Sequence, residues 1–533
     1  MSNELNFRTE DLTPEEIDRY FIETPADRAT IDAIKTKKTV VIQGARGVGK
    51  SFLLHVAKKE LDESFESEKV LAVYVTLNKA SLLKTSDSDK FKHWMLAKIC
   101  NRVMRAARKK GLIRARSTVF SSLAPDKDDD ALEPRLEQLE ERLEESWRSV
   151  EPVKDFDSSL DPESITDAIE DLCQDTGLRR VVLLVDEAAH VFIPNQQRQF
   201  FTLMRDLRTP YLSVKAAVYP GVTYFGDSFQ MRHDAELIDV NRDILEPGYL
   251  SSMREMVVRQ DPSLESVITK YGEAFDALAF SASGNPRILL KTVSSASPFN
   301  NNNVQKVMRE YYRDKIWSEH SELGNRYAGH RKVIDWGREF ITGVVLPYLD
   351  EKSKDKESLD TRIFLWIHRD APAAVKEALR LLCYSGILHE EGSGLVATRG
   401  HIGTRYMLNI GTRTGRQRNP VAFCTELRRS VSIKLMVEYG ANNRSYAEIE
   451  KLNIDQLEDG FNELLNQQLR KSVDALDLTF FLRNKLKELN FDTVEKALAA
   501  SEEDFMRAKG IGPVRSRHMM NAATAAVLEY LSG

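Results

Sequence analysis

The sequence predicts an α/β fold, in which a parallel sheet with a phosphate-binding loop and a helical lid is followed by a winged helix and an all-α helix-hairpin-helix domain. Three observations support the core of this prediction. A β-branched run at 40–42 leads through a glycine-rich turn into an amphipathic stretch at 52–61, which is typical of strand, loop and helix. Apolar runs at 70–77 and 180–185 have the composition of buried parallel strands. The second run ends in two acidic residues, which a parallel sheet delivers to its ligand-binding edge.

Length and charge set the limits of the interpretation. The chain has 533 residues, 42% hydrophobic residues and a net charge of -5. At about 150 residues per domain, this length predicts three or four domains. A charge so near balance means that a nucleic-acid surface would be a local patch. The four cysteines have neither metal-ligand nor disulfide spacing. No apolar run approaches the roughly 20 residues that span a bilayer, so we expect a cytoplasmic protein without membrane contact.

The turn after the first strand is a complete Walker A motif. Gly44, Gly47 and Gly49 let the backbone curl so that N–H groups point at phosphate oxygens. The helix that follows adds its positive N-terminal end. We expect Lys50 to reach the β- and γ-phosphates and the Ser51 hydroxyl to bind Mg²⁺. ATP with Mg²⁺ is therefore the predicted cofactor pair.

The acidic pair after the third apolar run has the position of a Walker B motif. Asp186 and Glu187 would lie beside the phosphates that the glycine turn holds. We expect Asp186 to hold Mg²⁺ through water, and Glu187 to orient or deprotonate the attacking water. The sequence thus supplies both an ion ligand and a catalytic acid–base group.

Two arginines are candidates to complete the site. Arg232 precedes the last expected core strand, at 235–240. There an arginine finger would reach the nucleotide of a neighbouring subunit, although a plain surface arginine fits equally well. Arg287 follows Pro286 at the expected start of a helix, which would aim it from the lid back at the nucleotide.

Taken in chain order, these signals resemble the AAA+ class of P-loop ATPases, and within it the origin-recognition initiator-like branch. The resemblance covers about residues 20–320. It rests on the two Walker motifs, on Arg232 and on the run Gly284-Asn285-Pro286-Arg287, of which the last is the most discriminating. It implies ATP binding and hydrolysis in an assembly whose subunits share the nucleotide.

The resemblance also implies two further roles. The lead-in Tyr20-Phe21-Ile22 would pack beside the adenine base, and a polar residue at the end of the fourth strand would sense the γ-phosphate. Tyr219 or Thr223 stands at that strand end in place of the usual asparagine. A long charged insertion at about 80–165 is a second departure from the family pattern. This range includes a basic helix expected at 89–112, which either faces solvent or contacts nucleic acid.

The second half begins with the expected winged helix. Its three helices and β-ribbon resemble the domain that follows the ATPase in origin-recognition proteins. In such a domain the third helix enters the major groove. Lys376 and Arg380 lie on that helix, but its mostly apolar composition leaves protein contact as open as DNA contact. The basic run at 411–418 is expected to be a linker. The three helices are expected at 330–349, 360–368 and 372–384.

The last block carries a helix-hairpin-helix pattern, with a short helix at 501–508, a tight turn at 509–512 and a second helix from 513. The glycines let backbone N–H groups approach a DNA phosphate, and the cations add charge without sequence information. The block is similar to the C-terminal domain of the RNA polymerase alpha subunit, with Phe481 where that family has a DNA-contacting arginine. DNA binding and protein docking both stay open. The candidate DNA contacts are Lys509, Gly510, Gly512, Arg515 and Arg517.

Together these signals predict an ATP-dependent switch that associates with duplex DNA and forms a homo-oligomer or binds a partner protein. Two other classes stay open. One is a signalling or anti-phage defence ATPase whose C-terminal modules bind a protein effector, and the other is a transposition-type target-selection ATPase. The expected parts are the ATPase core at 1–245, the helical lid at 246–320, the winged helix at 321–415, a helical connector at 416–474 and the helix-hairpin-helix domain at 475–533.

Overall fold

We describe the protein from a computed structural model. Its described residues are 5–6, 9, 12–77, 88–113, 136–138, 140–141, 160–188, 194–220, 225, 229–231, 233–352, 362–397, 400–431, 435–453 and 469–532. Thr223, Arg232, most of the charged insertion and residues 454–468 of the expected connector lie outside them.

Five parallel strands form the core sheet, in the order β2-β3-β4-β1-β5. This confirms the predicted α/β fold. Because β1 and β3 run parallel with only β4 between them, the glycine turn after β1 and Asp186 at the end of β3 lie at the same sheet edge. The strands are β1 (Val40–Gln43), β2 (Val70–Thr76), β3 (Arg180–Asp186), β4 (Leu212–Val218) and β5 (Glu236–Asp239).

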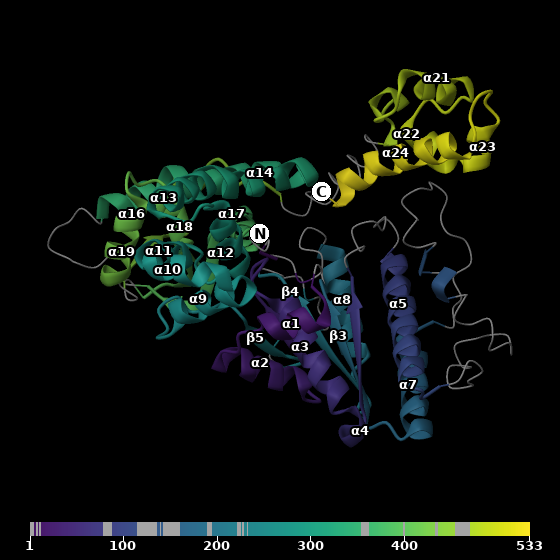
Figure 1. Ribbon diagram of the computed structural model, residues 1–533, viewed down its shortest axis with the longest axis horizontal. Coiled ribbons are helices and arrows are strands. Elements are labelled where there is room, and N and C mark those ends of the chain that lie inside the picture. Colours follow the sequence, from purple (N-terminus) through teal and green to yellow (C-terminus); the bar gives the residue numbers. More distant parts are fainter. Residues whose placement is uncertain are drawn as a thin grey trace.

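Helices cover both faces of this sheet (Figure 1). Leu183 belongs to a hydrophobic cluster that includes α5, α7 and α8, whereas the next residue, Leu184, belongs to a cluster that includes α2 and α3. This alternation explains why the strands read as continuous apolar runs. The helices are α1 (Pro14–Tyr20), α2 (Pro25–Lys35), α3 (Lys50–Glu63), α4 (Phe65–Glu68), α5 (Ser88–Lys109), α7 (Pro162–Thr176) and α8 (Pro194–Asp206).

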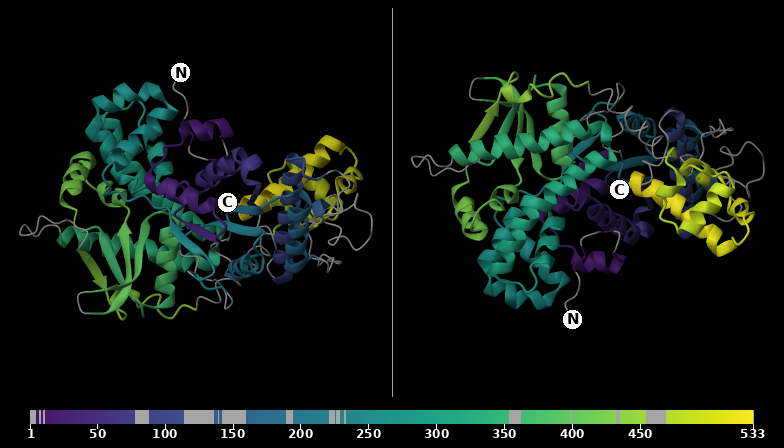
Figure 2. Two further views of the ribbon diagram at one scale, coloured as in Figure 1. Left: turned by 90° about the horizontal axis from the view of Figure 1, so that it is seen from below. Right: turned by 90° about the horizontal axis from the view of Figure 1, so that it is seen from above.

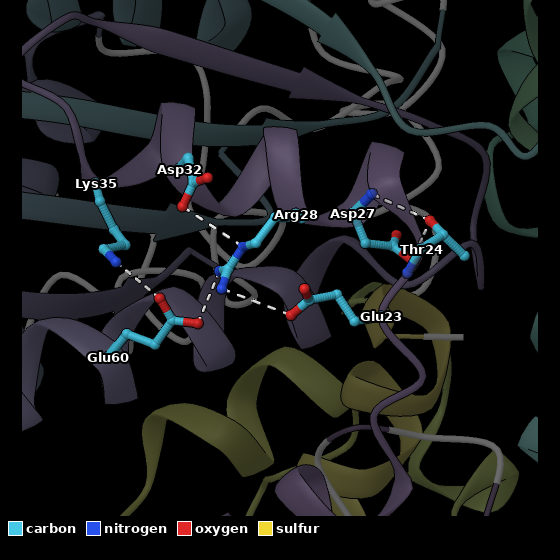
Figure 3. A network of polar contacts seen from close by, with 7 residues as sticks. All are labelled: Glu23, Thr24, Asp27, Arg28, Asp32, Lys35 and Glu60. Atoms are coloured by element: carbon cyan, nitrogen blue, oxygen red, sulfur yellow. Dashed lines mark hydrogen bonds and ion pairs between the residues drawn. The ribbon is translucent and has the colours of Figure 1, made fainter.

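A charged network holds α2 against α3, the helix that starts at the glycine turn (Figure 3). Thr24 and Asp27 form a capping box at the start of α2. Glu60 on α3 accepts hydrogen bonds from Arg28 at 2.7 Å and from Lys35 at 2.8 Å. One carboxylate therefore anchors two turns of α2.

The predicted basic helix is present as α5. Lys98 is only 3% exposed and pairs with Glu140 at 3.2 Å, and Arg105 pairs with Glu137. Both acids belong to the charged insertion. These two cations of α5 are therefore neutralised within the chain.

The lid and the segment after it share one hydrophobic cluster, whose members extend from Ile244 to Ile449 with Leu5 added. This body lies opposite α5 and α7 across the core (Figures 1 and 2). Its α-helices are α9 (Tyr249–Gln260), α10 (Glu265–Lys270), α11 (Gly272–Ser281), α12 (Pro286–Ser295), α13 (Asn301–Glu310), α14 (Ile316–Arg326), α15 (Arg331–Glu339), α16 (Leu346–Lys352), α17 (Ala373–Tyr384), α18 (Ile410–Thr414) and α19 (Pro420–Ser430). Two π-helical turns, η7 (Tyr311–Lys315) and η9 (Phe340–Val345), continue α13 and α15.

A second sheet in this body has the order β7-β8-β6-β9 and corrects two expectations. Residues 364–368, expected as helix, form a strand, because this short aromatic and β-branched run pairs on both sides, with β8 and β9. The expected helical connector at 416–474 contributes β9, which pairs parallel to β6. The strands are β6 (Phe364–His368), β7 (Leu388–Val396), β8 (Ile402–Leu408) and β9 (Met436–Tyr439).

The basic run at 411–418 is not an exposed linker. Arg413 is 2% exposed, and its guanidinium bonds Asp350 at 3.1 Å and the carbonyl oxygen of Arg362 at 3.0 Å. A Cβ on Gly411 would lie 2.0 Å from the ring of Tyr312. This segment is therefore closely packed inside the protein at Gly411 and Arg413. Its pattern of basic residues alone did not indicate that burial.

The C-terminal helices enclose a hydrophobic cluster of their own, from Leu469 to Ala523. Gly510, with φ +88°, stands in the tight turn between the last two helices. In the described part of the chain, no helix is both long and apolar enough to cross a membrane. All four cysteines are buried and free of disulfides. The helices are α21 (Phe480–Glu488), α22 (Val494–Ala499), α23 (Glu502–Met506) and α24 (Pro513–Ser532).

Candidate functional site

The glycine turn between β1 and α3 has the backbone that the Walker A pattern predicts. Gly47 and Gly49 have φ values of +91° and +108°, which favour glycine. Gly44 has no room for a side chain, since a Cβ there would lie 2.6 Å from Cγ2 of Val48. The loop therefore curls tightly into the start of α3, whose second residue is Ser51.

Lys50 is the buried cation of this loop. It is 8% exposed, and its Nζ donates hydrogen bonds to the carbonyl oxygens of Gly44 at 2.7 Å and Ala45 at 3.1 Å. Burial lowers the pKa of Lys50 to about 7; the negative charge of Asp186 opposes this shift, and the positive charge of Arg287 contributes to it. These electrostatic contacts place the predicted lysine, acid and lid arginine in one site.

The acidic pair at the end of β3 is held from two sides. Asp186 is 5% exposed; its Oδ2 accepts a hydrogen bond from the Tyr74 hydroxyl at 2.7 Å, and its Oδ1 accepts one from the Glu187 N–H at 2.9 Å. Glu187 has φ +51°. Left-handed backbone at a residue other than glycine is costly and is concentrated at functional sites.

Tyr74 was missed by the sequence analysis. It is the aromatic residue of an otherwise mostly aliphatic strand, β2, and it is partly exposed where most of its neighbours are buried. A polar hydroxyl in such a strand needs a hydrogen-bond partner. That need is the signal that would have marked the position.

Tyr219 occupies the strand-end position where a γ-phosphate sensor was expected. Its hydroxyl lies 3.5 Å from Oε1 of Glu187, and its ring centroid lies 4.3 Å from Nζ of Lys50. The second candidate for this role, Thr223, lies outside the described residues. Tyr219 therefore contacts both Lys50 and Glu187.

The lid motif closes directly on the glycine turn. Asn285 caps α12 and also donates from Nδ2 to the carbonyl oxygen of Arg46 at 2.8 Å. The N–H of Arg287 donates to the carbonyl oxygen of Gly47 at 3.4 Å. A Cβ on Gly47 would lie 2.6 Å from Cβ of Arg287. The predicted lid arginine is thus in contact with the loop, and Asn285, expected only as part of the same motif, is a second lid contact.

A pocket of about 90 Å³ lies beside the glycine turn, between α3 and the lid. Gly47 and Gly49 line it, so it adjoins the loop. Its walls are mostly apolar and include aromatic side chains, which can pack against a planar base. The lead-in Tyr20-Phe21-Ile22 lies in its wall, as expected, together with Phe52, Met256 and Leu290.

Arg232, the expected arginine finger, lies outside the described residues. Among other arginines considered for nucleic-acid contact, Arg380 is 6% exposed and bonds Glu377 on its own helix, α17, through Nε at 2.8 Å. Arg380 therefore does not face a DNA groove in this structure. Lys376 on the same helix is exposed.

The C-terminal hairpin brings the other candidate contacts together at one surface. Gly512 and Lys509 are exposed in the turn. Arg515 donates to the carbonyl oxygen of Gly510 at 2.7 Å, and Arg517 pairs with Glu502 at 3.4 Å. The ring of Phe481 lies beside this turn, with its centroid 5.5 Å from the guanidinium carbon of Arg515. Phe480 (77%), Phe481 (45%) and Val514 (84%) are exposed apolar side chains.

Comparison with known proteins follows this geometry. Residues 5–223 match the ORC-CDC6-like family model, and no curated protein matches the chain. The Walker-type ATPase PABY2304 of Pyrococcus abyssi is 14% identical, with 79% of this chain and 97% of that chain covered and a TM-score of 0.38. The Orc1 protein of Aeropyrum pernix, solved in complex with DNA, is 13% identical, with 78% and 92% covered and a TM-score of 0.30. The chain thus has an α/β fold with an AAA+ P-loop core, and its residues 5–223 are similar to the ORC-CDC6-like family.

Proposed function

We propose that this chain binds ATP with Mg²⁺ at the glycine turn and hydrolyses it, and that the nucleotide state controls its association with a macromolecular partner. The convergence of Lys50, Asp186 and Arg287 on one curled loop carries the proposal. The adjoining pocket, whose walls are mostly apolar and partly aromatic, supports it further.

Each residue then has a separate task. Lys50 would contact the β- and γ-phosphates, and Gly44, Gly47 and Gly49 would offer backbone N–H groups. Ser51 and Asp186 would hold Mg²⁺, which neutralises charge on the phosphates. Mg²⁺ relies on one or two carboxylates, phosphates and water, and the Asp186 carboxylate with the Ser51 hydroxyl is a donor set of that kind.

Hydrolysis would depend on Glu187 and on cations around the γ-phosphate. Glu187 would orient or deprotonate water, and Arg287 would reach the γ-phosphate from the lid. We assign Arg232 as a finger toward a neighbouring subunit, which makes a homo-oligomer part of the proposal.

Duplex DNA is the partner we favour. The exposed turn with Lys509, Gly510 and Gly512 has the features for backbone contact with a phosphate, because its glycines leave N–H groups accessible. Arg515 and Arg517 would add charge at the same surface. Binding of this kind would be largely independent of DNA sequence.

A protein effector is the second candidate, as in a signalling or defence ATPase. Phe480 and Phe481 on α21 and Val514 on α24 are exposed apolar side chains of the C-terminal helices, and exposed apolar surface often marks protein contacts. A transposition-type ATPase has no structural observation in its favour over these two.

The first test is nucleotide binding by the wild-type chain and by Lys50→Ala, measured by titration with a fluorescent ATP analogue. We expect the wild type to bind and the variant to lose at least about tenfold in affinity, since a charged hydrogen bond contributes about 1.5–3 kcal/mol. Circular dichroism of both proteins serves as the folding control. Equal affinities would refute the site.

The second test separates the two partners. Affinity for a random duplex is measured between about 50 and 200 mM salt, with and without ATP, and a DNA-binding switch should lose affinity steeply over that range. Absence of binding at low salt would favour the protein effector.

A further inference from the structure

Tyr219 connects the nucleotide site to the second half of the chain. Its ring meets the ring of Tyr384 edge-on, with centroids 5.0 Å apart and planes at 81°. On its other side the same tyrosine contacts Lys50 and Glu187, at 4.3 Å and 3.5 Å. Only the side chain of Tyr219 therefore separates Tyr384 from Lys50 and Glu187.

Tyr384 is rigidly placed. It is the last residue of α17, which packs against α15 and β7 and carries the buried Glu377–Arg380 pair. The next residue, Ser385, bonds Nδ1 of His320 through its hydroxyl at 2.7 Å. The backbone from which the Tyr384 ring projects is thus held in place by the packing of α17.

The same part of the fold also touches the lid motif. The N–H of Ile410 donates to Oγ of Ser283 at 2.8 Å, and Nδ2 of Asn409 donates to the carbonyl oxygen of Gly386 at 3.1 Å. Ser283 directly precedes the motif that contacts the glycine turn. Two contacts, one through Tyr384 and one through Ser283, therefore join the second sheet region to the nucleotide site.

The strained backbone of Glu187 makes the position of this residue sensitive to its contact with Tyr219. A left-handed glutamate is strained, and such strain persists only where the surroundings over-determine it. The Tyr219 hydroxyl is one of the groups that hold its carboxylate, and the Tyr384 ring limits where Tyr219 can lie. Loss of the Tyr384 ring would give Tyr219, and with it Glu187, new positions.

We propose that Tyr384 is a positioning residue for ATP hydrolysis: through Tyr219 it holds Glu187 in place, so that the packing of α17 against the ATPase core sets the hydrolysis rate. This inference rests on the proposed ATPase function. It assigns to the second half of the chain a direct part in the chemistry, and any partner that displaces α17 would change that rate.

The test measures ATP affinity, kcat and KM for the full-length wild type and for Tyr384→Ala. We expect kcat to fall roughly tenfold, a part of the 10²–10⁴-fold that a positioned acid–base group contributes, while ATP affinity changes less than about threefold. Tyr384→Phe should restore kcat, because the edge-to-face contact needs the ring and not the hydroxyl. Tyr348→Ala is the matched control, since Tyr348 is 41% exposed on α16 in the same body.

A double-mutant cycle separates positioning from a general loss of packing. In a Tyr219→Ala background, Tyr384→Ala should have little further effect on kcat, because both changes break the same link. If Tyr384→Ala does not fold, Tyr384→Leu keeps apolar volume without a ring edge and should show the same lowered kcat.

The outcomes are distinct. A wild type that neither binds nor hydrolyses ATP would refute the proposed function itself. A wild type that does both, with Tyr384→Ala and Tyr384→Leu at the wild-type kcat, would refute only the role of Tyr384. Additive effects of the Tyr219 and Tyr384 changes would also refute that role.

Discussion

At the scale of single residues, two buried lysines lie at opposite edges of the core sheet, and both donate to backbone carbonyls. Lys50 bonds Gly44 and Ala45 at the carboxyl edge. Lys215 bonds Thr36 and Lys38 at the amino edge. A Walker A pattern predicts the first. Nothing in the sequence marks the second. The reason for a lysine inside this apolar strand is the pair of backbone carbonyls that follow α2, and only the folded structure brings them to Lys215.

Lys215 gives a prediction about pH. It is 0% exposed, and burial, helped by Arg180, lowers its pKa to about 7. An unfolded lysine keeps its proton to about pH 10.4, so between these values the unfolded chain binds more protons than the folded chain. The free energy of unfolding contributed by Lys215 therefore rises with pH from about 7 to 10, by at most about 1.4 kcal/mol per pH unit.

Urea unfolding of the wild type and of Lys215→Met at about pH 7, 8 and 9 tests this. The variant should show a flatter dependence of the unfolding free energy on pH. Other titrating groups are common to both proteins and cancel in the difference. Parallel curves would contradict the assignment.

At the scale of elements, α17 is a buried helix and not a groove-reading helix. Its Glu377 and Arg380 side chains are 6% and 5% exposed and form a bidentate pair. The sequence places both charges on the helix but cannot tell that they face each other inside the protein. A helix with an apolar stripe and two charges three residues apart fits either environment.

This pair provides a stability prediction. Glu377→Gln should destabilise the protein by about 3–5 kcal/mol, because it leaves the Arg380 guanidinium buried without its counter-charge. The matched control is Glu310→Gln on α13. The side chains of Lys306 and Glu310 are 68% and 50% exposed, and their charged atoms lie 3.8 Å apart. The change in the free energy of unfolding should therefore be below about 0.5 kcal/mol. Similar urea midpoints for the two variants would show that the Glu377 pair is not buried in solution.

Strand β6 shows a second limit of reading elements from sequence. Four of its five residues are apolar, and a short apolar run does not distinguish a helix from a central strand. Pairing with β8 and β9 decides it. By contrast, β1 and β3 were predictable, because glycine and acidic residues at their ends mark where they stop.

At the scale of the whole molecule, the C-terminal helices have a hydrophobic cluster of their own. Among the described residues, this cluster includes none before Leu469, and the central body's cluster ends at Ile449. We therefore predict that a chain ending at residue 453 keeps ATP affinity within about twofold of the wild type and loses salt-dependent DNA binding. Fluorescent-nucleotide and DNA titrations of both chains measure this. Full retention of DNA binding would move the DNA contact into the first 453 residues.

The sequence by itself determined the nucleotide loop, the acidic pair, the lid arginine and the parallel sheet, because each is a local pattern: a strand end, a glycine turn or a proline-started helix carries its own constraint. Only the tertiary structure decided which distant side chains complete the site. Tyr74 on Asp186, Asn285 on the loop and Tyr384 behind Tyr219 come from segments far apart in the chain. Contacts of this kind depend on how whole helices and strands pack, so no local sequence pattern predicts them.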